Sequence, residues 1–172
     1  MKKRYQIRFI LFFALFMLIG HFLYYLSKSS LEPVLIEGLN VNVSVKLINF
    51  FSPDLLIVQN GRDIKSTSVN MTVATGCDGM DGILIILSAM LAFPMACRYK
   101  LPGLAIGILV VYLTNIIRIV LLFYILLKIP EWFDFFHIYI GQFMVIFAGG
   151  IFFLIWVSRY GTGKDSTHVR ED

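Results

Sequence analysis

Four long apolar runs constrain this chain more than any other feature of its sequence. They occupy roughly residues 7–26, 80–97, 103–127 and 138–157, and crossing a bilayer takes about 20 mainly apolar residues. The hydrophobic fraction of 58% exceeds the ~45–50% of soluble globular domains. The runs predict an all-α integral membrane protein with four transmembrane helices, although the second run is short and contains Pro94 near its end.

The basic residues indicate how these helices are oriented. They precede the first run, fill the short second connection and follow the last run: Lys2, Lys3, Arg4, Arg8, Arg98, Lys100, Arg159, Lys164 and Arg170. Because basic residues concentrate in cytoplasmic loops, both termini are expected inside the cytoplasmic (inner) membrane and residues 27–79 outside it. The first run is interpreted as a retained anchor, since it is long for a signal peptide and no A-x-A-like site follows it. We expect one multi-pass domain over residues 1–160 and a polar, disordered cytoplasmic tail over residues 161–172.

Residues 27–79 are the only sizeable segment expected outside the membrane. Asn60-Gly61 is a strong two-residue hairpin signal, and residues 69–73 alternate like a strand with one buried face. We therefore expect a small extracytoplasmic β-hairpin whose second arm leads directly to Cys77.

Residues 31–51, within this segment, allow two interpretations. Strict alternation over residues 40–47 favours a strand. A helix start at Pro33, together with many apolar residues, favours an interfacial helix on the membrane surface. The helix is slightly preferred.

Three reactive side chains stand where they could meet at the outer side of the bundle. Arg118 lies in the middle of the third run, Cys77 opens the second and His137 opens the fourth. An arginine at bilayer depth costs several kcal/mol unless it faces the protein interior and finds a partner. A thiol nucleophile needs a base, which histidine supplies, and acyl transfer develops negative charge, which arginine stabilises. The set predicts an active site in a wet, outward-facing cavity between the last three runs.

Three further polar residues accompany this set as supporting candidates. Asn115 is three residues before Arg118, so both share one helix face, where Asn115 can hold the guanidinium or donate to the same ligand. Asp78 and Asp81 disfavour a thiolate unless a cation compensates them. They also offer an alternative in which Arg118 only forms a structural ion pair with one of them.

The remaining cysteine and histidines are assigned no chemistry. Cys77 and Cys97 are expected at opposite ends of one helix, about 30 Å apart at ~1.5 Å per residue, which excludes a disulfide. Cys97 is expected to be an inert packing residue, His21 to bond or pack locally, and His168 to lie in the tail. No metal-ligand cluster, phosphate loop or haem motif occurs, so no metal or cofactor is expected. The net charge of +4 reflects membrane topology rather than nucleic-acid binding.

The ordered set of motifs resembles the exosortase/archaeosortase family, and most of all exosortase H. The matching stretches fall within residues 69–157 and are Gly76-Cys77-Asp78-Gly79, Leu91-Ala92-Phe93-Pro94, Asn115-Ile116-Ile117-Arg118-Ile119, Leu122-Phe123-Tyr124 and Phe136-His137-Ile138-Tyr139. The N-terminal half matches only loosely. Asp78 stands where many members carry Ser or Asn.

The resemblance implies a membrane-embedded cysteine transpeptidase that acts on the outer side of the membrane. It implies Cys77 as nucleophile, Arg118 and His137 as its catalytic partners, and exported substrate proteins that end in a short motif, a transmembrane helix and a basic tail. The acceptor, for example a lipid or a glycan, is not identified by the sequence. Two alternatives stay open: an intramembrane cysteine protease that releases its product to water, and a non-enzymatic membrane assembly subunit in which Arg118 pairs with Asp81.

Overall fold

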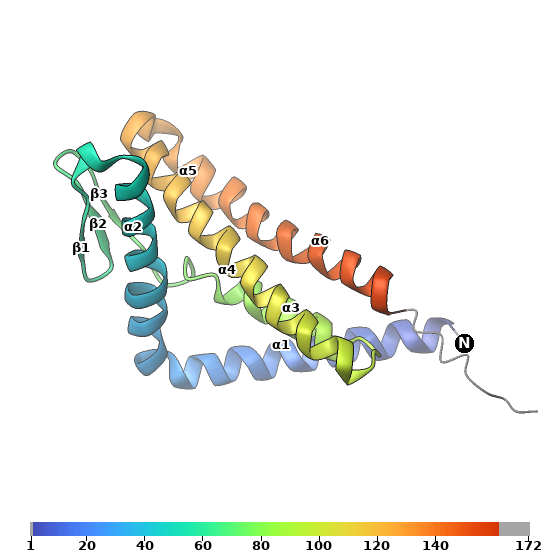
Figure 1. The fold of residues 1–172 in the computed structure, drawn as a ribbon. Helices are drawn as coiled ribbons and strands as arrows, with labels where there is room; N and C mark the ends of the chain where they lie inside the picture. The colour runs from blue at the N-terminus through green and yellow to red at the C-terminus, as the bar shows by residue number, and fades with distance from the viewer. Residues whose placement is uncertain (1, 162–172) are drawn as a thin grey trace, which may run out of the picture.

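The protein is mainly helical, as a computed structural model that describes residues 2–161 shows (Figure 1). Within this range three helical stretches are long and apolar enough to cross a membrane, namely Arg4–Phe51, Cys97–Lys128 and Pro130–Tyr160. The prediction of an all-α membrane protein is therefore confirmed. The predicted tail beyond residue 161, which contains His168, lies outside the described residues.

The first stretch comprises α1 (Lys2–Glu32), the π-helix η1 (Pro33–Val41) and α2 (Asn42–Phe51). It bends sharply at η1, so that α2 runs across the direction of α1 (Figure 1). Residues 31–51 are thus helical, and the strand that the alternation favoured is wrong. The helix wins because it gathers one apolar face, on which the buried residues recur every three to five positions: Ile36, Val41, Val45 and Ile48.

A three-stranded antiparallel sheet follows, after the short 3₁₀ turn η2 (Pro53–Leu55), in place of the expected two-stranded hairpin. Its strands are β1 (Val58–Asn60), β2 (Asp63–Lys65) and β3 (Asn70–Thr72), in that order across the sheet. Asn60 pairs with Asp63, so the turn residues are Gly61 and Arg62, one position later than the sequence signal indicated. The third strand, rather than the second arm of a hairpin, leads towards Cys77.

The second apolar run forms only a short helix, α3 (Met80–Ala92). Its 13 residues reach about 20 Å, less than the ~30 Å of a bilayer core, so the predicted fourth full-length span is not confirmed. The helix ends before Phe93, whose extended backbone (ψ 129°) suits a residue that precedes proline. Cys97 therefore begins the next helix instead of ending this one, and it is exposed rather than packed.

The last two long stretches pack along α3 as an antiparallel pair. They are α4 (Cys97–Lys128) and a second continuous stretch made of η3 (Pro130–Trp132), α5 (Phe133–Phe135), the π-helix η4 (Phe136–Gly141) and α6 (Gln142–Tyr160). Because α3 is short, it covers only the first part of α4. The C-terminal half of α4 packs instead against η1, α2 and the sheet, in an apolar cluster that includes Ile36, Ile64 and Phe123.

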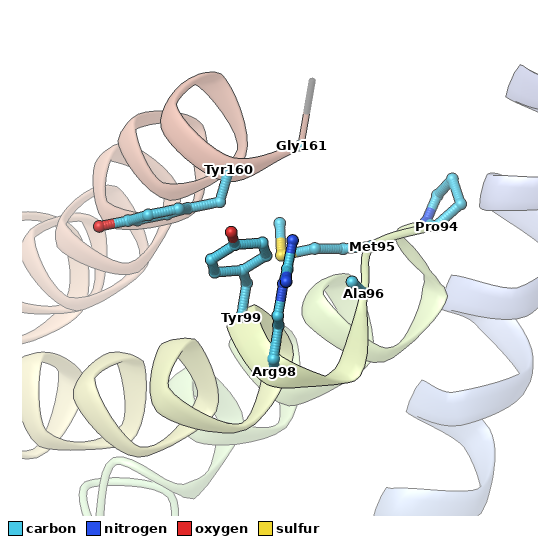
Figure 2. A pocket seen from close by; sticks show the side chains of 7 residues that line it. All are labelled: Pro94, Met95, Ala96, Arg98, Tyr99, Tyr160 and Gly161. Carbon is cyan, nitrogen blue, oxygen red and sulfur yellow. The ribbon is translucent and has the colours of Figure 1, made fainter. Parts of the chain in front are cut away.

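The end of the bundle that carries the basic residues is closed by aromatic side chains. The rings of Phe9, Phe93 and Phe153 lie 6.0–6.3 Å apart and join α1, the connection after α3, and α6. Beside them an open hollow of about 770 Å³ contains Arg98, whose guanidinium lies over the ring of Tyr99 (Figure 2). This hollow is at the opposite end of α3 from Cys77. The structure thus brings together the three regions that the charge pattern assigns to one side of the membrane.

Candidate active site

Cys77 lies in a short loop between β3 and α3. Its backbone N–H donates to the carbonyl of Ala74 at 3.0 Å, which closes a tight turn. Gly76 (φ +89°) and Gly79 (φ +80°) flank it with left-handed backbone that side chains rarely tolerate. The loop enters the bundle at the level of Asn115 on α4, so the thiol is partly buried rather than exposed at the surface.

The three reactive side chains predicted from the sequence meet at this loop. The sulfur of Cys77 lies 3.1 Å from His137 Nε2 and 3.9 Å from Arg118 Nη2. His137 comes from η4, and its ring stacks on Phe133 with the centroids 5.5 Å apart, which fixes the ring's orientation. Residues 41 and 60 positions apart from Cys77 thus converge on one sulfur atom.

The Arg118 side chain is buried, with 4% of its surface exposed, and it bonds to neutral groups. Its Nη1 donates to Gln142 Oε1 and its Nη2 to the carbonyl of His137, both at 3.3 Å. Gly141 lets the side chain pass, because a Cβ there would lie 2.6 Å from Arg118 Nε. These hydrogen bonds hold the guanidinium beside the thiol. Because both acceptors are neutral, they do not neutralise its positive charge.

Three influences, which act in opposing directions, set the pKa of the Cys77 thiol. Burial raises the pKa of the Cys77 thiol, the Arg118 guanidinium lowers it, and the Asp78 carboxylate raises it, with a net rise. Cys77 also precedes the first residue of α3 by three positions, outside the first helical turn. Because the net effect disfavours the thiolate, the chemistry needs a base in contact with the sulfur, which is the place that His137 occupies.

Comparison with known proteins agrees with this constellation. A model of a family described as transmembrane exosortase, of the EpsH type, matches residues 2–156. The chain belongs to the transmembrane exosortase family. The match covers almost the whole described chain, including the N-terminal half. No match is found among curated proteins or among solved structures.

Asn115 has a different place in this exosortase from the one expected. It is fully buried and makes no bond to Arg118; its Nδ2 donates to the carbonyl of Cys77 and to Asn40 Oδ1, each at 3.0 Å. Its side chain also lies against Gly79, where a Cβ would come within 3.0–3.1 Å of it. Asn115 therefore holds the backbone of the Cys77 loop instead of the guanidinium.

The two aspartates face away from Arg118. Asp78, 5% exposed, accepts hydrogen bonds from the hydroxyl of Tyr24 and from the backbone N–H of Met80. Asp81 lies 3.3 Å from His21 Nε2 on the α1 side of the loop. Among residues 2–161 no ion pair joins Arg118 to either aspartate, so the proposed Arg118–Asp81 pair of the assembly-subunit reading is wrong.

Sequence reasoning missed three residues that shape this site. Gln142 was visible as a polar residue in an apolar run, five positions after His137, and now accepts from Arg118. Tyr24 on α1 and Asn40 on η1 gave no such signal, because their partner in the site, Asp78, is more than 35 positions away in the chain. The alternation around Asn40 favoured a strand, and a strand gave no indication that this residue faces the site.

Proposed function

We propose that this exosortase is a membrane-embedded cysteine transpeptidase. It cleaves the C-terminal sorting signal of exported proteins on the outer side of the cytoplasmic membrane and transfers the new C-terminus to an acceptor. The observation that carries the proposal is the contact of one sulfur with an imidazole nitrogen at 3.1 Å and a buried guanidinium at 3.9 Å. These are the parts that acyl transfer through a cysteine requires.

In the first step Cys77 attacks the carbonyl carbon of the scissile peptide bond. His137 Nε2 takes the thiol proton as the sulfur–carbon bond forms, and Arg118 stabilises the negative charge that develops on the carbonyl oxygen. When the carbon–nitrogen bond breaks, the proton passes from His137 to the leaving amine. The product is a thioester between Cys77 and the substrate's new C-terminus.

In the second step an acceptor with a nucleophilic hydroxyl or amine attacks the thioester. Its proton goes to His137, the carbon–sulfur bond breaks, and the thiolate recovers a proton from the imidazole. A lipid or a glycan in the outer leaflet satisfies this chemistry. If water were the acceptor, the same steps would describe the alternative, an intramembrane protease.

The depth of the site supports a substrate that is itself anchored in the membrane. Arg118 is ten residues, or about 15 Å, from Lys128 at the outer end of α4. The exposed side chains of η4 and the start of α6 are mainly apolar, including Ile138, Ile140 and Phe143. A scissile bond close to a transmembrane helix reaches this depth, whereas a soluble peptide does not.

The distribution of basic residues along the chain supports the orientation. By this charge pattern we place both termini and the basic end of the bundle in the cytoplasm.

The proposal is tested by trapping the thioester. Membranes that contain the enzyme and a candidate substrate are treated with hydroxylamine, which converts a thioester to a hydroxamate at the substrate's new C-terminus. Mass spectrometry should find this hydroxamate with the wild type and with Cys97→Ser, and not with Cys77→Ser. A conjugate of the substrate without hydroxylamine identifies a transpeptidase, and a free carboxylate identifies a protease. Processing that continued unchanged in Cys77→Ser would refute the enzymatic proposal.

A further inference from the structure

Asn40 is a buried amide that reaches the candidate site from a distant part of the chain. It lies in η1, 37 positions before Cys77, and is 1% exposed. Its Nδ2 donates to the carbonyls of Leu35, at 2.9 Å, and Asp78, at 3.1 Å, and its Oδ1 accepts from Asn115 at 3.0 Å. Both the amide nitrogen and the amide oxygen of Asn40 therefore have hydrogen-bond partners.

Together Asn40 and Asn115 hold two consecutive carbonyls of the nucleophile loop. Asn115 Nδ2 binds the oxygen of Cys77, and Asn40 Nδ2 binds the oxygen of Asp78. The bond from Asn115 Nδ2 to Asn40 Oδ1 joins the two amides into one unit. Since burying a polar group without a partner costs about 1–3 kcal/mol, the loop keeps these bonds in preference to other orientations.

The loop needs such an external hold. Gly76 and Gly79 are conformationally permissive, so they do little to fix the backbone of the segment between them. The 3.1 Å contact of Cys77 with His137 depends on the direction in which that segment presents its side chain. The two anchored carbonyls restrict that direction, in addition to the bonds of the Asp78 side chain to Tyr24 and Met80.

The π-helical geometry of η1 is what delivers Asn40. The backbone N–H of Asn42 donates to the carbonyl of Glu37, five residues earlier, as a π-helix requires. Asn40 uses its own side chain to bind the carbonyl of Leu35, also five residues earlier. The widened turn therefore places an amide against the loop.

We infer that Asn40 is a positioning residue for the nucleophile: with Asn115 it fixes the Cys77–Asp78 segment so that the thiol faces His137. The inference rests on the proposed function, because positioning matters only if this thiol reacts with help from this histidine. If it is correct, the first helical stretch (α1, η1 and α2, called the helical arm below) also controls the reactivity of the Cys77 thiol, through η1.

The experiment measures how strongly His137 assists the reaction of Cys77 with iodoacetamide. All variants carry Cys97→Ser, so that Cys77 is the only thiol, and the alkylation rate is followed from pH 6 to pH 10 on purified protein in detergent. In this parent, His137→Ala should slow alkylation near neutral pH by about 10-fold or more, since a positioned base contributes ~10²–10⁴-fold to a full reaction. In an Asn40→Ala background, the same His137 change should alter the rate by less than about twofold, because the imidazole no longer faces the thiol.

The matched control is Asn49→Ala. Asn49 is also on this helical arm, and its amide clamps both backbone groups of Ile57, at 2.8 and 2.9 Å, far along the arm from the nucleophile loop. Its loss should reduce accumulation of the protein while leaving the His137 effect at its parent size. Asn40→Asp provides a second variant, which keeps the volume and the acceptor oxygen and loses both donors.

The outcomes separate the inference from the proposed function. If His137→Ala had no effect even in the parent, the proposed activation of the thiol would fail. If the His137 effect were present in the parent and fully retained in Asn40→Ala or Asn40→Asp, only the positioning role would be overturned. Failure of both Asn40 variants to accumulate, beside an Asn49→Ala variant that does, would make Asn40 a packing residue and also overturn it.

Discussion

Adding one methyl group at Gly141 should disable the site although none of the three reactive side chains is replaced. An added Cβ would lie 2.6 Å from Arg118 Nε and 3.2 Å from Arg118 Cδ. Uncrowded contacts begin at about 3.5 Å, so the guanidinium or the η4 backbone must move by roughly 0.9 Å. Arg118 Nη2 is already 3.9 Å from the Cys77 sulfur, which leaves little tolerance. A misplacement of about 1 Å can cost about 10²-fold in rate, which is the loss we expect for Gly141→Ala.

The assay compares substrate processing per folded molecule in membranes that hold Gly141→Ala or Gly150→Ala. Gly150 is the matched control, because it lies on the following helix α6 and a Cβ there meets nothing within 4 Å. Its substitution should leave processing unchanged and strengthen the helix slightly, by up to about 1 kcal/mol. Crowding at Gly141 also costs about 1–3 kcal/mol of stability, so accumulated protein is measured in parallel. Wild-type processing per molecule in Gly141→Ala would refute the idea that the placement of Arg118 controls the reaction.

Further predictions concern the nucleophile, the charge and the topology. Cys77→Ser should abolish processing at normal accumulation, whereas Cys97→Ser should be silent because Cys97 is exposed and far from the site; immunoblots of substrate and enzyme decide this. Arg118→Lys should be severely impaired and Arg118→Ala worse, by about 10²–10³-fold, with no rescue by Asp81→Asn; recovery in that double mutant would make the role structural. Because the guanidinium lowers the pKa of the Cys77 thiol, Arg118→Ala should also move the pH midpoint of its alkylation upward; an unmoved midpoint would contradict the electrostatic role. A reporter fused after Tyr160 should be active only if it works in the cytoplasm, and export-dependent activity there would break the topology.

The sequence by itself determined the class of protein and the identity of the reactive groups. Long apolar runs can only be satisfied in a membrane or a large core, so the helical membrane class followed from composition and length. Cys77, Arg118 and His137 stood out because each is a costly or reactive group placed in or beside an apolar run. That signal is local, since it needs only the side chain and its immediate neighbours in the chain.

Only the tertiary structure decided how these groups meet. The sequence placed Cys77 and Cys97 on one helix, but α3 ends at Ala92, just before Phe93-Pro94, and the packing of the helices brings the Cys77 loop to the level of Arg118. The sequence also left Arg118 a choice of partners, and the fold turns Asp81 towards His21 and gives Arg118 neutral partners such as Gln142.

The contribution of Asn40 was hidden for the same physical reason. An amide shows its role only through its partners, and those of Asn40 include Asp78 and Asn115, 38 and 75 positions away. Local periodicity records which face of an element is apolar, and here the alternation favoured a strand, although a helix was slightly preferred for the whole stretch. Which distant backbone groups a buried side chain must satisfy is fixed when the helices pack, because only then are those groups removed from water and brought within hydrogen-bonding distance.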